Sequence, residues 1–188
     1  MSLYQLPADL PAPLDDGACD HLPGSKAPSL TLDSSRGPVD LAELGTGLGV
    51  LYVYPRTGRP DRAVPAGWDA IPGARGCTPQ SCAFRDHVAE LASLGARVAG
   101  LSAQSLEDQI EFAQREHMPF PVLADPDRRL GEALGLPTFD FEGVTLYKRV
   151  TLVLEAGTIG KVFYPVFPPD RNAADVVEFL REREQRSA

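Results

Sequence analysis

The chain is short of cysteine, of basic residues and of long apolar runs, and each shortage excludes a class of protein. Three cysteines in 188 residues are too few for a disulfide-stapled scaffold. The net charge is −8 with no basic run, which argues against nucleic acid or an anionic membrane as a partner. No apolar run approaches the roughly 18 residues of a membrane span. We therefore expect a globular protein that neither binds nucleic acid nor crosses a membrane.

The N-terminal region bears on the compartment in which we expect the protein to work. It lacks both a basic n-region and a continuous apolar h-region, so it does not read as a signal peptide. The expected compartment is the cytoplasm, where cysteines stay reduced unless they do redox work or bind metal. Length and a hydrophobic content of 43% suit one globular domain. Residues 1–26, rich in proline, glycine and acid, predict an extended arm on a single domain over residues 27–188.

Apolar periodicity along the chain predicts strands that alternate with helices. Such an order favours an α/β layered fold, and a hairpin late in the chain adds an antiparallel part to the sheet. The predicted elements are a hairpin and short helix within 27–44, strands at 48–55, 97–103 and 120–125, and a hairpin within 148–166. The predicted helices cover residues 77–95, a segment starting at Ser105, a short segment closed near Gly135, and a C-terminal segment capped near Asp170.

A long connection, residues 56–76, separates the first of these buried strands from the helix after it. Loops of this length inside compact domains are usually functional or disordered. Trp68 and Ile71 give this loop apolar anchors, so we expect it to be ordered.

The stretch "GARGCTPQSCAFRDH" holds two of the three cysteines at the start of a predicted helix. Pro79 suits a first helical turn, and Thr78 before it is a natural N-cap. Cys77 then lies at a helix N-terminus, where free N–H groups and the helix dipole stabilise an anion and favour a reactive thiolate. Arg75 can add to this effect.

The spacing of the two cysteines predicts a switch rather than a structural disulfide. In an intact helix the Cα atoms of Cys77 and Cys82 are roughly 8–9 Å apart, whereas a disulfide needs about 4.4–6.8 Å. The start of the helix must therefore unwind before the sulfurs can join. If the oxidant is a peroxide, Cys77 becomes a sulfenic acid, Cys82 condenses with it, and an outside dithiol reduces the resulting disulfide.

The same residues resemble a known family. "GCTPQSCAFRD" is similar to the active-site stretch of the Q-type peroxiredoxins, also called bacterioferritin comigratory proteins, and the similarity extends to "KAPSLTL", "LYVYP", "FPVLADPDRRLGEALG" and "KRVTLVLEAGTIGKVF". The resemblance implies a thioredoxin-like fold, with a central mixed sheet, flanking helices and here an N-terminal extension. It also implies a peroxidase for hydrogen peroxide and organic hydroperoxides, recycled by a thioredoxin-like or glutaredoxin-like dithiol protein, with no metal or organic cofactor.

Carried over by position, the resemblance assigns roles to particular residues. Cys77 is the peroxidatic cysteine and Cys82 the resolving one. Arg149 holds the thiolate and polarises the peroxide. Backbone N–H groups around Gly76 and Cys77 bind the attacked oxygens, in the manner of an oxyanion hole. Thr78 and Arg75 stand beside them as supporting residues.

The sequence departs from the family pattern at two positions before the peroxidatic cysteine. A Thr or Ser is expected three residues before it, and Ala74 stands there; a proline is expected seven residues before it, and Ala70 stands there. The proline's place can be taken by Pro55 or Pro72. The hydroxyl's place can be taken by Thr78, Arg75 or a group from the 56–76 loop.

Other interpretations of the two thiols stay open. The same fold can serve a protein disulfide oxidoreductase or a peroxide-sensing redox relay, although the close C-x-x-C spacing of oxidoreductases is absent. Cys77, Cys82 and His87 also lie at five-residue intervals, but zinc sites use four ligands and commonly tighter cysteine spacing. A pair of inert buried cysteines is the remaining alternative.

Several residues outside this stretch have simpler interpretations. Cys19 is expected to be a bystander in the arm, with a role as a second resolving thiol as the alternative. Arg85 is expected to pair with Asp86 or a nearby carboxylate. We expect a monomer or a weak homodimer. Three aromatics are expected to cover one end of the core or, if exposed, to form a dimer face: Phe163, Tyr164 and Phe167.

Overall fold

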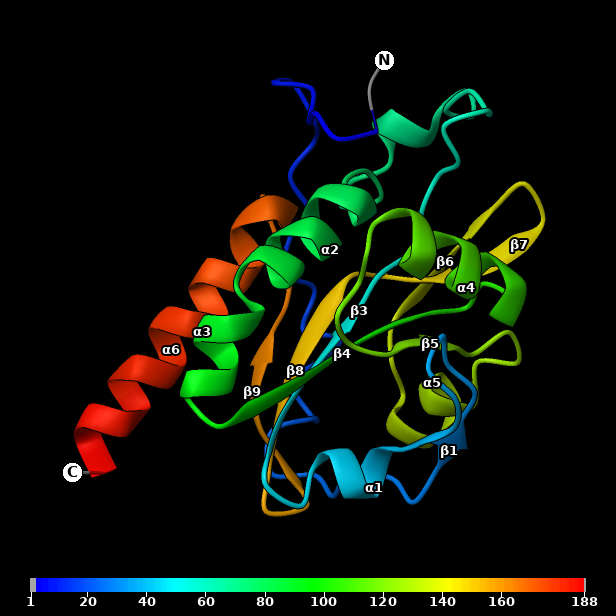
Figure 1. Cartoon of the computed structure of the whole chain (residues 1–188). Helices are drawn as coiled ribbons and strands as arrows, with labels where there is room; N and C mark the ends of the chain where they lie inside the picture. Colours follow the sequence, from blue (N-terminus) through cyan, green and yellow to red (C-terminus); the bar gives the residue numbers. More distant parts are fainter. Residues whose placement is uncertain (1–2, 188) are drawn as a thin grey trace.

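A five-stranded mixed sheet forms the centre of the molecule, seen in a computed structural model that describes residues 3–187 (Figure 1). The strand order is β5-β4-β3-β8-β9. Pairing is parallel between β3, β4 and β5 and antiparallel between β3, β8 and β9. The expected α/β fold with an antiparallel part is confirmed. The strands are β3 (Leu48–Val53), β4 (Ala96–Ser102), β5 (Val122–Ala124), β8 (Val150–Glu155) and β9 (Thr158–Phe163).

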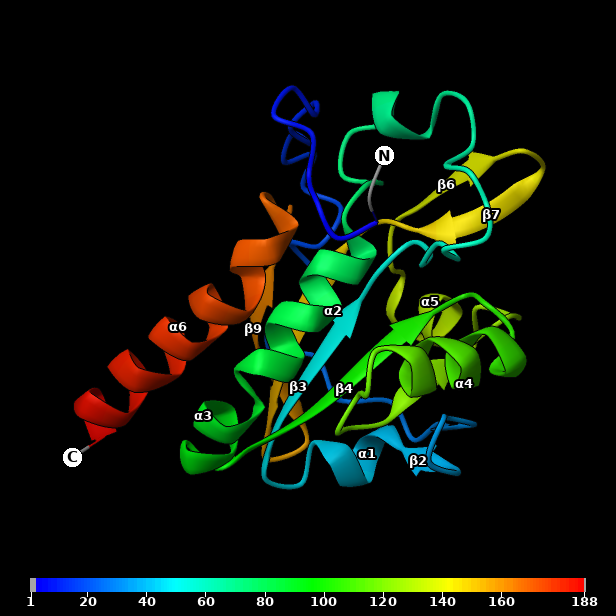
Figure 2. The same cartoon turned by 45° about the horizontal axis from the view of Figure 1, so that its top comes forward.

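The central strand β3 is buried on both faces, which explains its unbroken apolar sequence. Val50 and Tyr52 face one apolar core, and Leu51 and Val53 face the other, as the period of two in a strand requires. Helices therefore cover the sheet on both sides (Figures 1 and 2). One core receives side chains from α2 (Cys77–Asp86), α3 (Val88–Ser93), α4 (Leu106–Arg115) and α6 (Asn172–Ser187); the other receives them from α1 (Leu41–Leu44) and α5 (Arg129–Leu134).

Local capping chemistry fixes the ends of two helices where the sequence predicts them. The Ser105 side chain accepts a hydrogen bond from the Asp108 N–H and caps α4. Helix α5 ends at Gly135, whose φ of 63° is easy for glycine. The predicted early hairpin is also present, as the short strands β1 (Thr31–Leu32) and β2 (Val39–Asp40).

The structure differs at two places from the elements that the sequence predicts. The single helix expected over 77–95 is interrupted at His87 (φ −96°, ψ 4°), which separates α2 from α3, although Phe84 and Leu91 still face one core. A hairpin that the sequence analysis did not identify is formed by β6 (Thr138–Phe141) and β7 (Val144–Tyr147). Its turn is Glu142-Gly143, with φ values of 51° and 78°.

This hairpin holds the 56–76 loop in place. Trp68, in the short helix η1 (Trp68–Ala70), is 5% exposed and packs against Phe139 and Phe141 of β6. The Arg56 guanidinium lies 4.6 Å from the centre of the Trp68 ring, on its face. The expectation of an ordered loop anchored by Trp68 is confirmed.

The N-terminal segment packs against the domain. Cys19 and Leu22 belong to the core that α1 and α5 cover. Polar contacts from Asp16 to Lys148 at 2.7 Å and to Tyr164 at 2.8 Å tie the segment to residues just before β8 and just after β9. Whether residues 1–26 act as a unit separate from residues 27–188 stays a prediction. Within residues 3–187, no helix is long and apolar enough to cross a membrane.

Candidate active site

Cys77 is the first residue of α2, and Gly76 forms the N-cap before it. Gly76 has a φ of 104°, and a Cβ atom there would lie 2.4 Å from Cγ of Pro169 and 2.9 Å from Cδ2 of Leu6. Only glycine meets both demands. The prediction that Thr78 caps the helix is therefore wrong: Thr78 is the second residue of α2 and is buried.

The Cys77 thiol has polar contacts on two sides although it is only 3% exposed. Its Sγ lies 3.3 Å from Nη2 of Arg149 and 3.7 Å from the carbonyl oxygen of Ala74. The first N–H groups of a helix have no acceptor within it, and Pro79 has no N–H, so the N–H groups of Cys77 and Thr78 remain at this end of α2. Together with the Arg149 charge they surround the Cys77 sulfur with positive ends of dipoles and one cation.

Arg149 joins the active-site loop to the sheet. It directly precedes β8 and is 3% exposed. Its Nη2 donates to three successive carbonyl oxygens of residues 73–75, at 3.2, 3.2 and 3.1 Å, while its Nη1 donates to Oε1 of Gln80. These contacts fix the guanidinium plane against the Cys77 sulfur.

Gln80 extends this contact into a buried polar network that sequence reasoning missed. Its Nε2 donates to Oδ1 of Asn172 at 2.9 Å, and the Thr151 hydroxyl donates to the same oxygen at 2.7 Å. Gln80 is fully buried between the two cysteines of α2. A glutamine inside "CTPQSC", on the same helix as two thiols, is the one sequence signal that could have indicated it.

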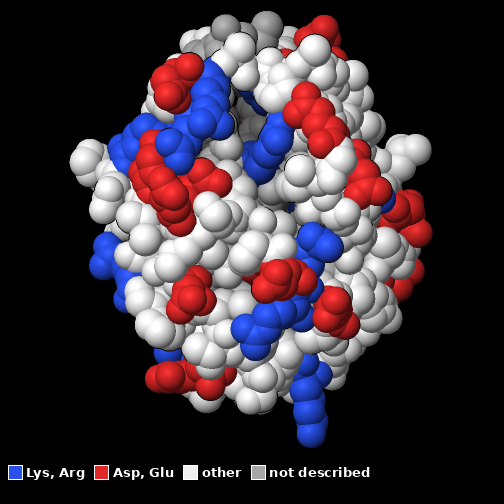
Figure 3. Space-filling view, turned by 90° about the vertical axis from the view of Figure 1, so that its right-hand side faces the viewer, with Lys and Arg blue, Asp and Glu red and all other residues white. Residues whose placement is uncertain are grey.

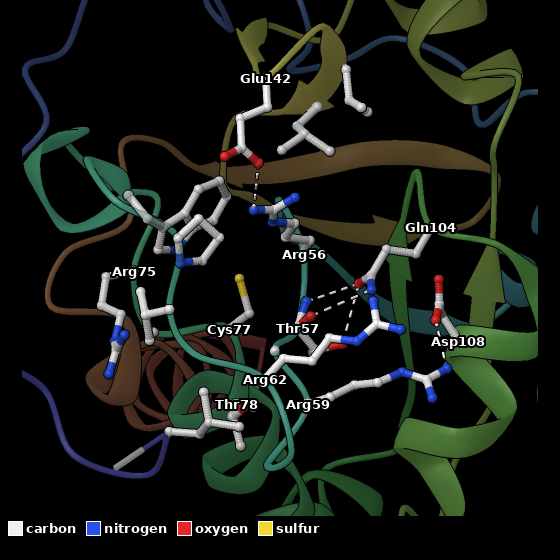
Figure 4. A pocket seen from close by; sticks show the side chains of 18 of the residues that line it. Arg56, Thr57, Arg59, Arg62, Arg75, Cys77, Thr78, Gln104, Asp108 and Glu142 are labelled. Carbon is white, nitrogen blue, oxygen red and sulfur yellow. Dashed lines mark hydrogen bonds and ion pairs between the residues drawn. The ribbon is translucent and has the colours of Figure 1, made fainter. Parts of the chain in front are cut away.

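Arg75 contributes to the site through its backbone more than through its charge. Its carbonyl oxygen accepts from Arg149 at 3.1 Å, whereas its guanidinium forms an ion pair with Asp69 at 3.3 Å. In Figure 4 the Arg75 side chain points away from the Cys77 sulfur.

An open cavity of about 510 Å³ reaches Cys77 (Figure 4). Residues of the 56–76 loop, the start of α4 and the β6–β7 hairpin line it. Thr57 is one of them: its N–H lies 2.8 Å and its hydroxyl 3.2 Å from Oε1 of Gln104. A threonine hydroxyl is therefore present in the cavity that contains Cys77, although Ala74 itself offers none.

Comparison with known proteins shows the family to which the chain belongs. The family model described as Redoxin matches residues 22–178. The chloroplastic peroxiredoxin Q of Sedum lineare is 32% identical over 160 residues, which are 84% of this chain and 77% of the relative. The chain belongs to the peroxiredoxins of the Q type. It is therefore a thiol peroxidase, an oxidoreductase that reduces peroxides with a cysteine.

Further relatives and solved structures place the chain in the same group. The chloroplastic peroxiredoxin Q of Arabidopsis thaliana is 31% identical, and the match spans 66% of that protein. The crystal structure of the peroxidoxin BcpB from Mycobacterium tuberculosis superposes with a TM-score of 0.70 at 25% identity, covering 86% of this chain and 98% of that one. Xanthomonas campestris peroxiredoxin Q shares the fold, with a TM-score of 0.65 at 22% identity over 93% of this chain and 98% of that one. The thioredoxin-like fold is thus confirmed.

Cys82 lies in this peroxiredoxin five residues after Cys77 on the same unbroken helix, and both are free thiols. Its Sγ is 3.7 Å from Oε2 of Glu116. Burial raises the pKa of the Cys82 thiol to about 11; Arg85 opposes that shift, and the Glu116 carboxylate reinforces it. A raised pKa favours the thiol form of Cys82 at neutral pH while α2 is intact.

The remaining candidate residues stay outside the site. Cys19 lies in the core on the other face of the sheet from Cys77, and burial, with help from Asp16, raises the pKa of its thiol to about 12. Arg85 pairs with Asp86 at 2.9 Å, as predicted. In the part of the chain that the structure describes, no three His, Cys, Asp or Glu side chains gather as metal ligands.

Proposed function

We propose that Cys77 is the peroxidatic cysteine of this peroxiredoxin, Cys82 the resolving cysteine and Arg149 the residue that activates the first thiol. The observation that supports this assignment is the 3.3 Å contact between Nη2 of Arg149 and Sγ of Cys77 at the end of an open cavity. Gly76 sets the turn that brings Cys77 to the helix start, and the Thr78 N–H and the Arg75 carbonyl complete the surroundings.

In the first step the Cys77 thiolate attacks the distal oxygen of a hydroperoxide. The S–O bond forms as the O–O bond breaks, so the sulfur is oxidised to a sulfenic acid and the peroxide is reduced. The leaving oxygen departs as hydroxide or alkoxide and takes a proton to become water or an alcohol. Negative charge moves onto the peroxide oxygens, where Arg149 and the first N–H groups of α2 stabilise it.

In the second step the first turn of α2 unwinds and the Cys82 sulfur attacks the sulfenic sulfur. Water leaves and a Cys77–Cys82 disulfide forms. A thioredoxin-like or glutaredoxin-like dithiol then exchanges with this disulfide, which restores two thiols and oxidises the partner. The outside dithiol supplies the two electrons that reduce the peroxide, by way of Cys77 and Cys82. We therefore propose no metal or organic cofactor.

We further propose that Thr57 supplies the hydroxyl that Ala74 lacks. Thr57 lines the Cys77 cavity, is 8% exposed, and follows the end of β3 by four residues. Its hydroxyl can donate to a bound peroxide oxygen in place of Gln104.

The cycle suits a reducing compartment, because Cys77 and Cys82 must return to thiols after each turnover. We propose the cytoplasm and a protein that works as a monomer or a weak homodimer.

Coupled turnover tests the assignment. Peroxide-dependent NADPH oxidation is measured with thioredoxin and its reductase, and separately with glutaredoxin, glutathione and glutathione reductase, for wild type, Cys77→Ser and Cys82→Ser. We expect turnover in wild type with at least one system, none in Cys77→Ser, and little in Cys82→Ser. If the disulfide forms but neither system turns over, while the oxidised protein oxidises other dithiol proteins, the chain is a redox relay and the recycling proposal is wrong.

A further inference from the structure

A buried carboxylate lies against the second thiol of α2. It belongs to Glu116, the C-cap residue of α4, which is 4% exposed. On the face shown in Figure 3, by contrast, acidic and basic side chains lie beside one another at the surface, where water competes for them. Because water does not compete in the same way at a buried carboxylate, its hydrogen bonds fix its geometry.

The two oxygens of this carboxylate have different partners. Oε1 accepts a hydrogen bond from the Tyr4 hydroxyl at 2.8 Å and another from Arg115. Oε2 accepts a hydrogen bond from the Cys82 thiol at 3.7 Å and lies 3.9 Å from Nη1 of Arg85. The contacts at Oε1 therefore orient the carboxylate, and Oε2 meets the thiol. The charged and titratable groups around this contact come from the N-terminal segment, α2 and α4: Tyr4, Cys82, Arg85, Asp86, Arg115 and Glu116.

The contact lies in the part of α2 that need not unwind for the disulfide to form. A helical turn takes about 3.6 residues, so Cys82, the sixth residue of α2, lies beyond the first turn. Phe84 is fully buried in the core, and Nη1 of Arg85 donates to the backbone carbonyl of Glu116 at 2.9 Å. The second half of α2 and the end of α4 thus stay joined while Cys77 moves toward Cys82.

The resolving thiol needs a base, because the thiolate and not the thiol is the nucleophile. The pKa of Cys82 is raised to about 11, so at pH 7 only about one molecule in ten thousand carries the thiolate. A carboxylate that already contacts the thiol can take its proton while the new bond forms, which is general base catalysis.

We propose that Glu116 is a catalytic residue of the resolving step and accepts the Cys82 proton at Oε2. As the proton leaves, the Cys82 sulfur attacks the sulfenic sulfur of Cys77: the S–S bond forms, the S–O bond breaks, the Cys82 sulfur is oxidised and the Cys77 sulfur is reduced. The hydroxyl group leaves as hydroxide and becomes water with one proton, and Glu116 releases one proton to solvent. The inference rests on the proposed roles of Cys77 and Cys82 and adds the base.

The test measures disulfide formation from pH 6 to pH 8 after one equivalent of hydrogen peroxide, by acid quench and mass spectrometry. We expect Glu116→Gln to form the disulfide about 100-fold more slowly than wild type at pH 7. Its rate should rise about tenfold per pH unit, because hydroxide must then remove the proton. The wild-type rate should change little, since the carboxylate takes the proton. Oxidation of Cys77 should be unchanged, and the longer-lived sulfenic acid should be over-oxidised more readily.

Glu111→Gln is the matched control and should behave as wild type. Glu111 is also a carboxylate of α4 and pairs with Arg115 at 2.8 Å, but its side chain is not a partner of the Cys82 thiol. Unwinding precedes the proton transfer, so Glu116→Gln is also measured in a Gln80→Ala background, which lacks the side-chain hydrogen bonds of Gln80 to the first turn's partners.

A disulfide rate that Glu116→Gln leaves unchanged or raises in both backgrounds would overturn the inference while leaving the peroxidase intact. A wild-type rate that itself rises tenfold per pH unit would do the same, and this result needs no variant to fold. If hydrogen peroxide produces no Cys77–Cys82 disulfide in wild type, the proposed function fails, and the inference fails with it.

Discussion

Replacement of Gln80 by alanine should accelerate disulfide formation without removing the peroxide reaction. Gln80 lies between the two cysteines of α2, and its side chain links the helix start to Arg149 and Asn172. Unwinding of the first turn must break both hydrogen bonds. They therefore stabilise the helical form, in which Cys77 reacts, over the unwound form, in which Cys82 reaches it.

The size of this effect follows from the two contacts. A neutral hydrogen bond contributes about 0.5–1.5 kcal/mol, and one to a charged group about 1.5–3 kcal/mol. Alanine has the higher helix propensity, which offsets up to roughly 0.7 kcal/mol. A net loss of about 2 kcal/mol raises the unwound population about 30-fold. Arg149 keeps its contacts to the carbonyls of residues 73–75, so the first step should change by less than about threefold.

The two steps can be separated by rapid mixing with peroxide, followed through Trp68 fluorescence. The first phase depends on peroxide concentration and reports sulfenic acid formation; the second does not and reports the disulfide. In Gln80→Ala we expect the second phase to be about 30-fold faster. The variant should also be more resistant to over-oxidation, because the sulfenic acid has less time to meet a second peroxide.

The control is Gln114→Ala. Gln114 is an exposed glutamine on α4, so this variant loses a side-chain amide but keeps the hydrogen bonds among Gln80, Arg149 and Asn172. A second phase in Gln80→Ala that is unchanged or slower would refute the reasoning, because it would mean that unwinding of α2 does not limit resolution.

Three further predictions follow from the same geometry. Thr57→Val should lower the rate of Cys77 oxidation by about tenfold, measured by single-turnover mixing, whereas Thr57→Ser should retain most of it; equal rates in both variants would contradict a role for the hydroxyl. Gly76→Ala should slow the same step and lower the melting temperature, because its Cβ would lie 2.4 Å from Pro169; an unchanged variant in both assays would count against the strained turn. The half-buried Cys82 thiol should make the folded enzyme less stable at high pH, because its pKa is raised from 9.0 to about 11. Its contribution to stability is fully present below pH 9 and is lost as the pH rises toward 11. The free energy of urea unfolding of the reduced protein should therefore fall more between pH 8 and pH 10.5 in wild type than in Cys82→Ser; an equal fall in both would contradict this.

The sequence predicted the parts of this fold that depend on local pattern. The strand at residues 48–55 is a continuous apolar run because both of its faces are buried. Ser105 and Gly135 mark helix ends through contacts within a few residues of themselves. The late hairpin follows from two apolar segments separated by a turn, and its strands β8 and β9 pair as expected.

What the sequence did not show depends on contacts between distant segments. At position 76 a Cβ atom would collide with Leu6 and Pro169, which lie far from Gly76 in the chain. Gln80 and Asn172 are 92 residues apart, and nothing local marks them as partners.

The loop and the arginine of the site show the same limit. The 56–76 loop is ordered by the aromatic residues of the β6–β7 hairpin, which periodicity alone did not identify. Only the resemblance to a known family pointed to Arg149. Its 3.3 Å contact with Cys77 depends on the fold, which brings together residues that lie 72 apart in the chain.

The most direct test of the whole account is the fate of each thiol after one equivalent of peroxide. Reduced wild type, Cys77→Ser and Cys82→Ser are mixed with hydrogen peroxide, and the products are identified by mass spectrometry with a sulfenic acid trap. We predict rapid oxidation that needs Cys77, a trapped sulfenic acid on Cys77 in Cys82→Ser, and a Cys77–Cys82 disulfide in wild type. If Cys77→Ser is oxidised as fast as wild type, or if the wild-type thiols react no faster than free cysteine, the assignment of Cys77 is wrong.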